Sequence, residues 1–190
     1  VVRFADTRGD TFSIFDESND TDKGDVAEFI KYLNIPLDLR DYQTEAIYHS
    51  IKQNRSLLVS PTASGKSLII YCLIRYYLLK QHEKILLLVP TISLVSQMFK
   101  DFGDYGFHSE TNCHTITAGK DKDSWQRIYI STWQSVYKEK RSYFEKFGVI
   151  FVDEAHLAKA ASLKSIMEKL PNCKYRFGLT GTLDGTESNK

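Results

Sequence analysis

Short apolar runs alternate with helix-patterned segments along most of the chain. Wholly apolar runs such as Ile85–Val89 and Val149–Val152 are typical of strands buried on both faces. Strands are predicted at 56–60, 84–89, near 114–117, 128–131, 148–152 and 175–180, and helices at 22–33, 41–53, 66–80, 92–102 and 162–170, with helical turns at 132–145. This alternation predicts an α/β fold with a mainly parallel, doubly wound sheet.

The first residues depart from this pattern. Residues 1–22 are polar and acidic, with apolar residues only near Phe4 and from Phe12 to Phe15, and the chain starts without methionine. We expect residues 1–35 to contain the end of a preceding domain, a linker and a short helix that Pro36 ends. Residues 36–190 are then expected to form one domain.

The composition adds little beyond a general class. The chain is 42% hydrophobic and 26% charged, as in ordinary soluble globular proteins. The apolar runs are too short to cross a bilayer, and no charged-then-apolar amino-terminal segment suggests export, so we expect an intracellular protein with no membrane partner. Cys72, Cys113 and Cys173 are scattered, without zinc-ligand spacing, and fit reduced thiols.

The strongest local motif is a phosphate-binding loop. The segment Ser60-Pro61-Thr62-Ala63-Ser64-Gly65-Lys66-Ser67 leads from an apolar strand into a helix, with Ser60 where the usual first glycine would stand. Backbone N–H groups of such a loop and the positive end of its helix face a bound anion. Lys66 can reach β- and γ-phosphates, and the Ser67 hydroxyl can ligate Mg²⁺. Taken alone, the segment also fits an ordinary loop and helix cap.

A pair of acids follows the apolar run 149–152. Asp153-Glu154-Ala155-His156 begins at the carboxyl end of that predicted strand, where ligands of open parallel sheets bind, so Asp153 and Lys66 can face one nucleotide. Asp153 is suited to hold Mg²⁺, and Glu154 to polarise the water that attacks the γ-phosphorus. The alternative is a solvated turn or helix start.

Together with four further motifs, these segments resemble the first motor domain of superfamily 2 helicases. The further matches are Leu39–Gln43 with the adenine-reading motif, Val89–Gln97 with motif Ia, Ser131–Ser135 with the next strand-contacting motif, and Leu179–Thr182 with motif III. In the adenine-reading motif, Asp41 stands where proline is usual. All six motifs occur in the family's order between residues 37 and 184.

The resemblance implies a RecA-like P-loop NTPase domain that uses ATP and Mg²⁺ and acts on nucleic acid. Within the superfamily, it points to helicases that remodel branched or forked DNA. The site residues carried over are, for catalysis, Lys66, Asp153, Glu154 and His156; for ATP, Arg40, Gln43, Pro61, Thr62, Ala63, Ser64, Gly65, Lys66 and Ser67; for Mg²⁺, Ser67 and Asp153; for nucleic acid, Thr91 and Thr132; and for coupling, Thr180, Gly181 and Thr182.

Three of these residues also have simpler readings. The Gln43 amide can pair with an adenine edge, but it also fits a glutamine on a helix surface. Thr91 and Thr132 each follow a predicted strand and open a helical segment, so their hydroxyls fit either a phosphate contact or a plain helix cap.

The family's second motor domain, with its arginine finger, has no counterpart in this sequence. We therefore expect the chain to need the second RecA-like domain of its parent chain for efficient hydrolysis. Alternatives to a DNA helicase are a double-strand DNA translocase of a restriction system, an RNA helicase, and a nucleotide-gated binding module without turnover. The presence of Lys66, Asp153 and Glu154 argues against the last.

Overall fold

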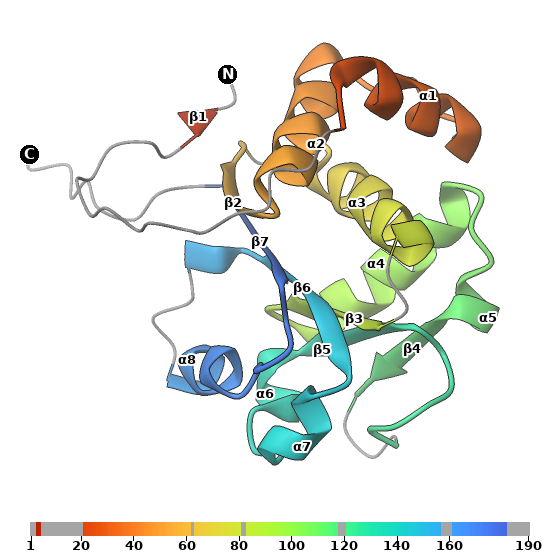
Figure 1. Ribbon diagram of the computed structural model, residues 1–190. Helices are drawn as coiled ribbons and strands as arrows, with labels where there is room; N and C mark the ends of the chain where they lie inside the picture. Colours follow the sequence, from red (N-terminus) through yellow and green to blue (C-terminus); the bar gives the residue numbers. More distant parts are fainter. Residues whose placement is uncertain are drawn as a thin grey trace, which may run out of the picture.

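The computed structural model describes the backbone of residues 3–4 and residues 21–61, 63–80, 83–117, 121–156 and 161–181. These residues form one seven-stranded sheet with the order β1-β2-β7-β6-β3-β5-β4 (Figure 1). The strands are β1 (Arg3–Phe4), β2 (Arg55–Val59), β3 (Lys84–Val89), β4 (Cys113–Ile116), β5 (Ile128–Thr132), β6 (Phe147–Asp153) and β7 (Tyr175–Thr180). In this order, every pair of neighbouring strands between β2 and β4 is parallel, and β1 is antiparallel to β2. The mainly parallel sheet confirms the predicted fold class.

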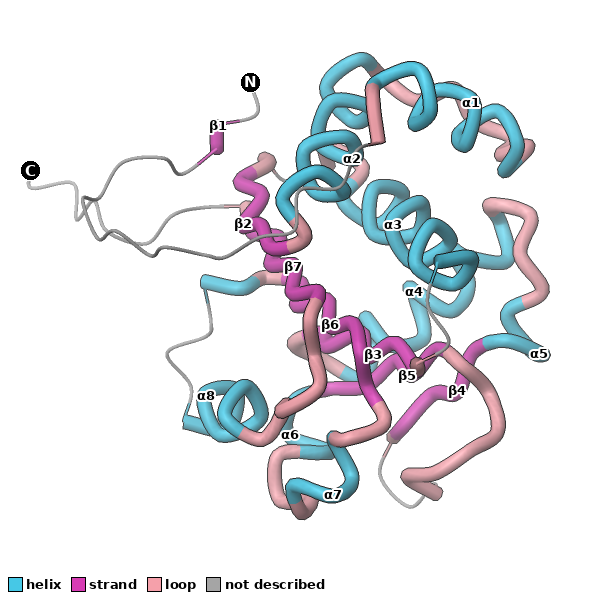
Figure 2. The backbone as a smooth tube through the Cα atoms, in the orientation of Figure 1, coloured by secondary structure: helices cyan, strands magenta, loops and turns pink. Residues whose placement is uncertain are grey.

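Helices cover both faces of this sheet. They are α1 (Lys23–Leu33), α2 (Asp41–Gln53), α3 (Lys66–Lys80), α4 (Ile92–Asp104), α5 (Ser109–Asn112), α6 (Trp133–Val136), α7 (Arg141–Phe144) and α8 (Ala161–Glu168). Helices α1 to α4 lie on one side of the sheet, and α6, α7 and α8 lie on the other (Figure 2).

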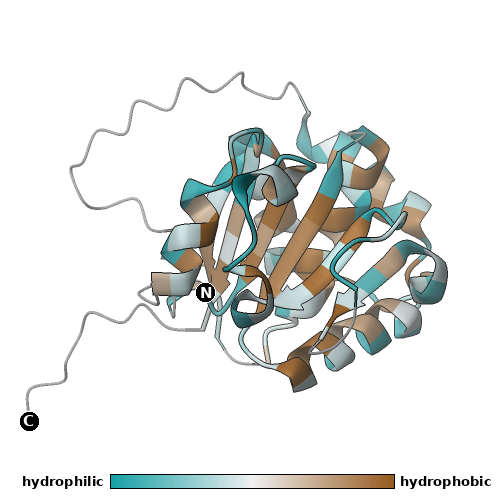
Figure 3. Ribbon diagram, turned by 90° about the horizontal axis from the view of Figure 1, so that it is seen from below, coloured by the Kyte–Doolittle hydropathy of each residue, from teal (hydrophilic) through white to brown (hydrophobic). Residues whose placement is uncertain are grey.

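The continuous apolar run in β3 is explained by these two layers. Ile85, Leu87 and Val89 belong to the apolar cluster under α1 to α4, whereas Leu86 and Leu88 belong to the cluster under α6 to α8. Successive side chains of a strand point to opposite faces, so a strand with helices on both sides has no polar face. In Figure 3 the central strands are brown along their length, and teal residues lie mainly on the surrounding helices and loops.

Helix α1 ends at Leu33 as predicted, because Asn34 adopts a left-handed backbone (φ 48°) that caps the helix before Pro36. It begins one residue later than predicted, at Lys23, because Asp22 is the N-cap. The single turn α5 was not predicted, since four residues are too few to show a helical period.

The amino-terminal region contacts the rest of the described structure. In β1, Phe4 pairs with Leu58 of β2, and in α1 the buried Val26 joins the apolar cluster that includes α3. The boundary expected at residue 35 stays a prediction. In the described part of the chain, no helix combines the length and apolar character that crossing a membrane requires.

All three cysteines are buried and free of disulfide bonds. Burial raises the pKa of Cys72, Cys113 and Cys173 to about 12, so these thiols stay protonated near neutral pH.

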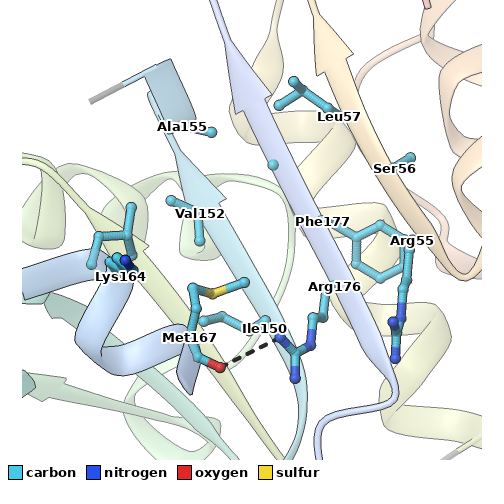
Figure 4. Close-up of a pocket in the computed structure, with 12 residues that line it drawn as sticks. Arg55, Ser56, Leu57, Ile150, Val152, Ala155, Lys164, Met167, Arg176 and Phe177 are labelled. Atoms are coloured by element: carbon cyan, nitrogen blue, oxygen red, sulfur yellow. Dashed lines mark hydrogen bonds between the residues drawn. The ribbon is translucent and has the colours of Figure 1, made fainter. Parts of the chain in front are cut away.

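An apolar groove of about 590 Å³ lies between α8 and strands β2, β7 and β6 (Figure 4). It is lined by Arg55, Ser56, Leu57, Ile150, Val152, Ala155, Leu163, Lys164, Met167, Arg176, Phe177 and Gly178. Leu57 is 39% exposed there. None of the lining residues belongs to the predicted nucleotide site, so the groove is a separate feature of the sheet.

Candidate nucleotide-binding site

The phosphate loop joins β2 to α3 and is anchored to the end of β7. The Ser60 N–H donates to the Thr180 carbonyl at 2.8 Å. The buried Ser60 hydroxyl donates to the Ser64 hydroxyl at 2.5 Å, which links the two ends of the loop. The serine that replaces the usual glycine therefore stabilises the loop through its side chain.

Two residues of the loop adopt left-handed backbone conformations, Ala63 at φ 62° and Gly65 at φ 77°. A Cβ atom on Gly65 would lie 2.3 Å from Gln43 Nε2, so position 65 requires glycine both for its backbone and for this close approach. The loop then enters α3, where the N–H groups of Leu68 and Ile69 donate to the Gly65 carbonyl. Thr62 lies outside the described residues.

Lys66 and Glu154 meet at this edge of the sheet. Lys66 Nζ lies 3.4 Å from Glu154 Oε1 and donates to the Ser60 carbonyl at 3.5 Å. Both side chains are largely shielded from solvent, at 11% and 27% exposure. The two residues assigned to phosphate binding and to water activation are thus neighbours, and in this structure they neutralise each other's charge.

Glu154 is also connected to the segment that follows β7. Its backbone is left-handed (φ 52°), and its Oε2 accepts from the Gly181 N–H at 3.3 Å. The same Oε2 lies 3.2 Å from His156 Nδ1, which in turn lies 2.7 Å from Thr180 Oγ1. His156, assigned to catalysis, and Gly181, assigned to coupling, therefore both contact the Glu154 carboxylate, and Thr180, also assigned to coupling, is linked to it through His156. Thr182 lies outside the described residues.

Asp153 is the last residue of β6 and is only 5% exposed. Its Oδ1 has no hydrogen-bond partner within the described residues. Burial, together with the neighbouring Glu154 carboxylate, raises the pKa of Asp153. A buried carboxylate oxygen without a partner is costly, and a divalent cation would satisfy it. This orphaned oxygen fits the predicted Mg²⁺ ligand, with the Ser67 hydroxyl as the second protein oxygen assigned to the ion.

Gln43 lies beneath the phosphate loop and is 4% exposed. Its Nε2 donates to the Ser64 carbonyl at 3.0 Å, and its Oε1 accepts from the Arg40 N–H at 2.9 Å. The simpler reading as a surface glutamine is therefore wrong. The amide braces the loop here, and adenine recognition by Gln43 and Arg40 stays a prediction.

Tyr42 braces the same loop and was missed by sequence reasoning. Its hydroxyl donates to the Ser64 carbonyl at 2.7 Å and accepts from Arg40 Nη1 at 3.1 Å. The only signal in the sequence was its position beside Gln43 in the adenine-reading motif. A second missed residue, Tyr105, lies 2.8 Å from the Ser67 hydroxyl, and no motif points to it.

The two threonines predicted to contact nucleic acid both cap helices. Thr91 Oγ1 accepts from Leu94 N–H at the start of α4, and Thr132 Oγ1 accepts from Ser135 N–H at the start of α6, each at 3.3 Å. Thr91 is exposed, whereas Thr132 is 4% exposed. Both stand at carboxyl ends of strands that pair directly, with Val89 opposite Thr132. A phosphate contact at either position stays a prediction.

The strand order and this site define the class of the protein. A phosphate loop between β2 and α3, with Asp153 and Glu154 at the end of a strand separated from β2 by β7, is the arrangement of a RecA-like P-loop NTPase, as in the first motor domain of superfamily 2 helicases. The chain belongs to the family described as "Type III restriction enzyme, res subunit", which it matches over residues 36–185.

Individual relatives are longer than this chain. This chain is 40% identical over 152 residues to the ATP-dependent DNA helicase uvsW of Enterobacteria phage T4, and the aligned region covers 78% of this chain and 30% of that protein. It is 30% identical over 146 residues to the DNA 3'-5' translocase XPB2 of Sulfurisphaera tokodaii, covering 77% and 31% respectively.

The fold is shared with a solved structure of the first of these relatives. A crystal structure of the UvsW helicase from bacteriophage T4 superposes with a TM-score of 0.82 at 36% identity, covering 90% of this chain and 64% of that one. The chain thus resembles UvsW in both sequence and fold, and it spans about a third of the length of the curated relatives it matches.

Proposed function

We propose that this chain is the ATP-binding motor domain of an ATP-dependent DNA helicase. The observation that carries the proposal is the meeting of Lys66, Glu154 and the unpartnered Asp153 oxygen at one edge of the sheet. A cation for phosphate, a base for water and an oxygen ligand for a metal are the groups that nucleotide hydrolysis requires. Relatives named as DNA helicases support the choice of nucleic acid as the partner.

The residues divide the work of hydrolysis as follows. Backbone N–H groups of the loop and the amino terminus of α3 bind the phosphates. Lys66 leaves Glu154 for the β- and γ-phosphates, and this frees the Glu154 carboxylate to take a proton from the attacking water. The water oxygen bonds to the γ-phosphorus as the bond to the bridging oxygen breaks, giving ADP and phosphate. Asp153 and Ser67 would hold Mg²⁺, which neutralises phosphate charge when bound.

Coupling to nucleic acid would run through His156 and Thr180. Because His156 lies between the Glu154 carboxylate and the Thr180 hydroxyl, a change at the γ-phosphate alters contacts at the end of β7. Hydrolysis changes nucleic-acid affinity only if the two nucleotide states bind the strand differently. We place the remaining strand contacts and the arginine finger in a second RecA-like domain of the parent chain.

The proposed substrate is branched or forked DNA, in recombination, repair and replication. The likeness to UvsW supports this choice. The family description favours, as a second candidate, a double-strand DNA translocase of a restriction system. We place the protein inside the cell, and in the host cytoplasm if it is encoded by a phage, because its proposed substrates are there.

The test is the ATPase activity of the parent protein with forked DNA, linear duplex, single-stranded DNA and RNA, all at one salt concentration because phosphate contacts are salt-dependent. We expect forked DNA to stimulate most and Lys66→Ala to abolish the stimulation. Equal stimulation by plain duplex would instead support the translocase, and a preference for RNA would support an RNA helicase. ATP binding without turnover would leave a nucleotide-gated binding module.

A further inference from the structure

Tyr105 is fixed beside the predicted metal ligand Ser67. It directly follows α4, where its N–H donates to the Asp101 carbonyl at 2.9 Å. Its ring packs against that of Tyr71 on α3, with 5.2 Å between ring centroids. Its hydroxyl oxygen lies 2.8 Å from Ser67 Oγ. Packing and the backbone contact therefore hold the phenol at a residue of the phosphate loop that is 38 positions away in the sequence.

This contact matters because of the chemistry of a serine hydroxyl. The group has one proton and two lone pairs, and a cation takes a lone pair. The proton of a metal-bound hydroxyl must then point away from the ion, toward an acceptor. The Tyr105 oxygen, 2.8 Å from Ser67 Oγ, is placed to be that acceptor when the metal is bound. A phenol has an ordinary pKa of about 10, so it is neutral near pH 7 and its oxygen can accept this hydrogen bond.

We propose that Tyr105 is a positioning residue for nucleotide-bound Mg²⁺: by accepting a hydrogen bond from the Ser67 hydroxyl, it aims the lone pairs of Ser67 at the metal. The proposal rests on the proposed function of this site. It also gives α4 a role at both ends, because the helix that begins at the predicted nucleic-acid contact Thr91 ends at the residue that orients the metal ligand.

The test is a Mg²⁺ titration of fluorescent ADP binding to the parent protein, a readout that needs no turnover. Tyr105→Phe removes only the hydroxyl. We expect it to raise the Mg²⁺ concentration at half-saturation about 10-fold, the lower range for loss of a group that orients a metal ligand. Binding of the nucleotide without Mg²⁺ should be unchanged.

Tyr71→Phe is the matched control. It removes a hydroxyl from the same aromatic cluster, but that hydroxyl accepts from Arg75 Nη1 at 2.6 Å, whereas Ser67 is hydrogen-bonded to Tyr105. This variant should keep the Mg²⁺ dependence of the unmodified protein. Thermal unfolding of both variants measures any general loss of packing.

A double-mutant cycle with Ser67→Ala separates positioning from structure. If Tyr105 acts through Ser67, Tyr105→Phe should have no further effect on the Mg²⁺ midpoint once Ser67 is alanine. An unchanged midpoint in Tyr105→Phe, or the same shift in Tyr71→Phe, would overturn the inference. If the unmodified protein bound ADP equally well with and without Mg²⁺, the proposed function itself would be refuted. That outcome differs from one in which only the role of Tyr105 is refuted.

Discussion

At the scale of single residues, the candidate site holds conformations and charges that are unfavourable in isolation. Ala63 and Glu154 have left-handed backbones, and the Asp153 carboxylate is buried with one oxygen unpartnered in the described structure. Each of these costs free energy and persists where the surrounding structure and a function require it. Their grouping around one loop is the pattern expected of a ligand site.

Asp153→Asn should stabilise the metal-free protein while abolishing Mg²⁺-dependent ATP hydrolysis. The folded state raises the pKa of Asp153. The protonated carboxyl therefore adds to the free energy of unfolding below the ordinary aspartate pKa of about 3.9, and this contribution is lost as pH rises through the pKa of the folded state. At pH 7 we expect a gain of about 1 kcal/mol, or roughly 2–4 °C in Tm for a chain of this size.

The measurement is thermal unfolding in a chelator between pH 4 and 8. The gain should shrink toward the acid end, where the carboxyl of the unmodified protein is protonated and its burial costs less. A gain that is independent of pH, or a loss of stability at pH 7, would contradict the account of Asp153 as an unpaired buried charge.

Gly65→Ala should destabilise the protein more than Gly106→Ala does. Both glycines have positive φ, at 77° and 88°, but a Cβ at 65 meets Gln43 Nε2, whereas at 106 it has nothing within 4 Å. We expect about 1–2 kcal/mol for the backbone term at either site and a further 1–3 kcal/mol for the clash at 65. Denaturant unfolding gives both values, and nucleotide binding should weaken only in Gly65→Ala. Equal losses of stability in the two variants would show that the Gln43 side chain moves away from the new Cβ atom at little cost.

At the scale of elements, the parallel strands bring together the ends of segments that are far apart in the chain. Register pairs Asp153 with Leu179 and Val59 with Thr180, so the phosphate loop, the acidic pair and the segment after β7 meet at one edge. Helices α3, α4 and α6 follow strands β2, β3 and β5 directly, so their amino termini lie at the same edge, and α4 carries Thr91 there.

Thr91→Ala should weaken DNA binding by the parent protein, and Thr91→Ser should not. The hydroxyl caps α4 and is exposed, so its loss removes about 1 kcal/mol of helix stability together with the predicted phosphate contact. Asp22→Ala removes the cap of α1 in the same way and serves as the control, with no effect on DNA expected. Fluorescence anisotropy with forked DNA measures the affinities. If Asp22→Ala weakened DNA binding to a similar extent, Thr91 would act only as a helix cap and not as a DNA contact.

At the scale of the whole molecule, the chain spans only part of the length of its relatives. We expect this chain alone to bind ATP weakly and to hydrolyse it about 10³–10⁵-fold more slowly than a chain that includes a second motor domain with its arginine finger. Steady-state ATPase assays of the two lengths, with and without DNA, make the comparison. Efficient unwinding of duplexes by this chain alone would refute the two-domain account.

Secondary-structure elements were predictable from the sequence when they were long enough to show a hydrophobic pattern. Helix α3 and strands β3 and β7 have the predicted bounds because long periods and continuous apolar runs record burial directly in the residue order. The two-residue β1 and the single turn α5 were missed because segments so short have no period. The sequence predicted that Lys66 and Asp153 lie at one edge, since both follow strands of one parallel sheet, but the ion pair of Lys66 with Glu154 was not predicted.

The order of residues was sufficient to specify the α/β layering, the phosphate loop and the acidic pair, because backbone preference and burial are local properties of a segment. Only the folded structure shows the hydrogen bonds of this site. Gln43 and Tyr42 donate to the Ser64 carbonyl, the Ser60 hydroxyl donates to that of Ser64, and the Tyr105 and Ser67 hydroxyls are bonded to each other. These partnerships depend on how helices and loops pack against one another, and a hydrogen bond requires a placement within a few tenths of an ångström. Such placement is a property of the assembled core, which no single segment contains.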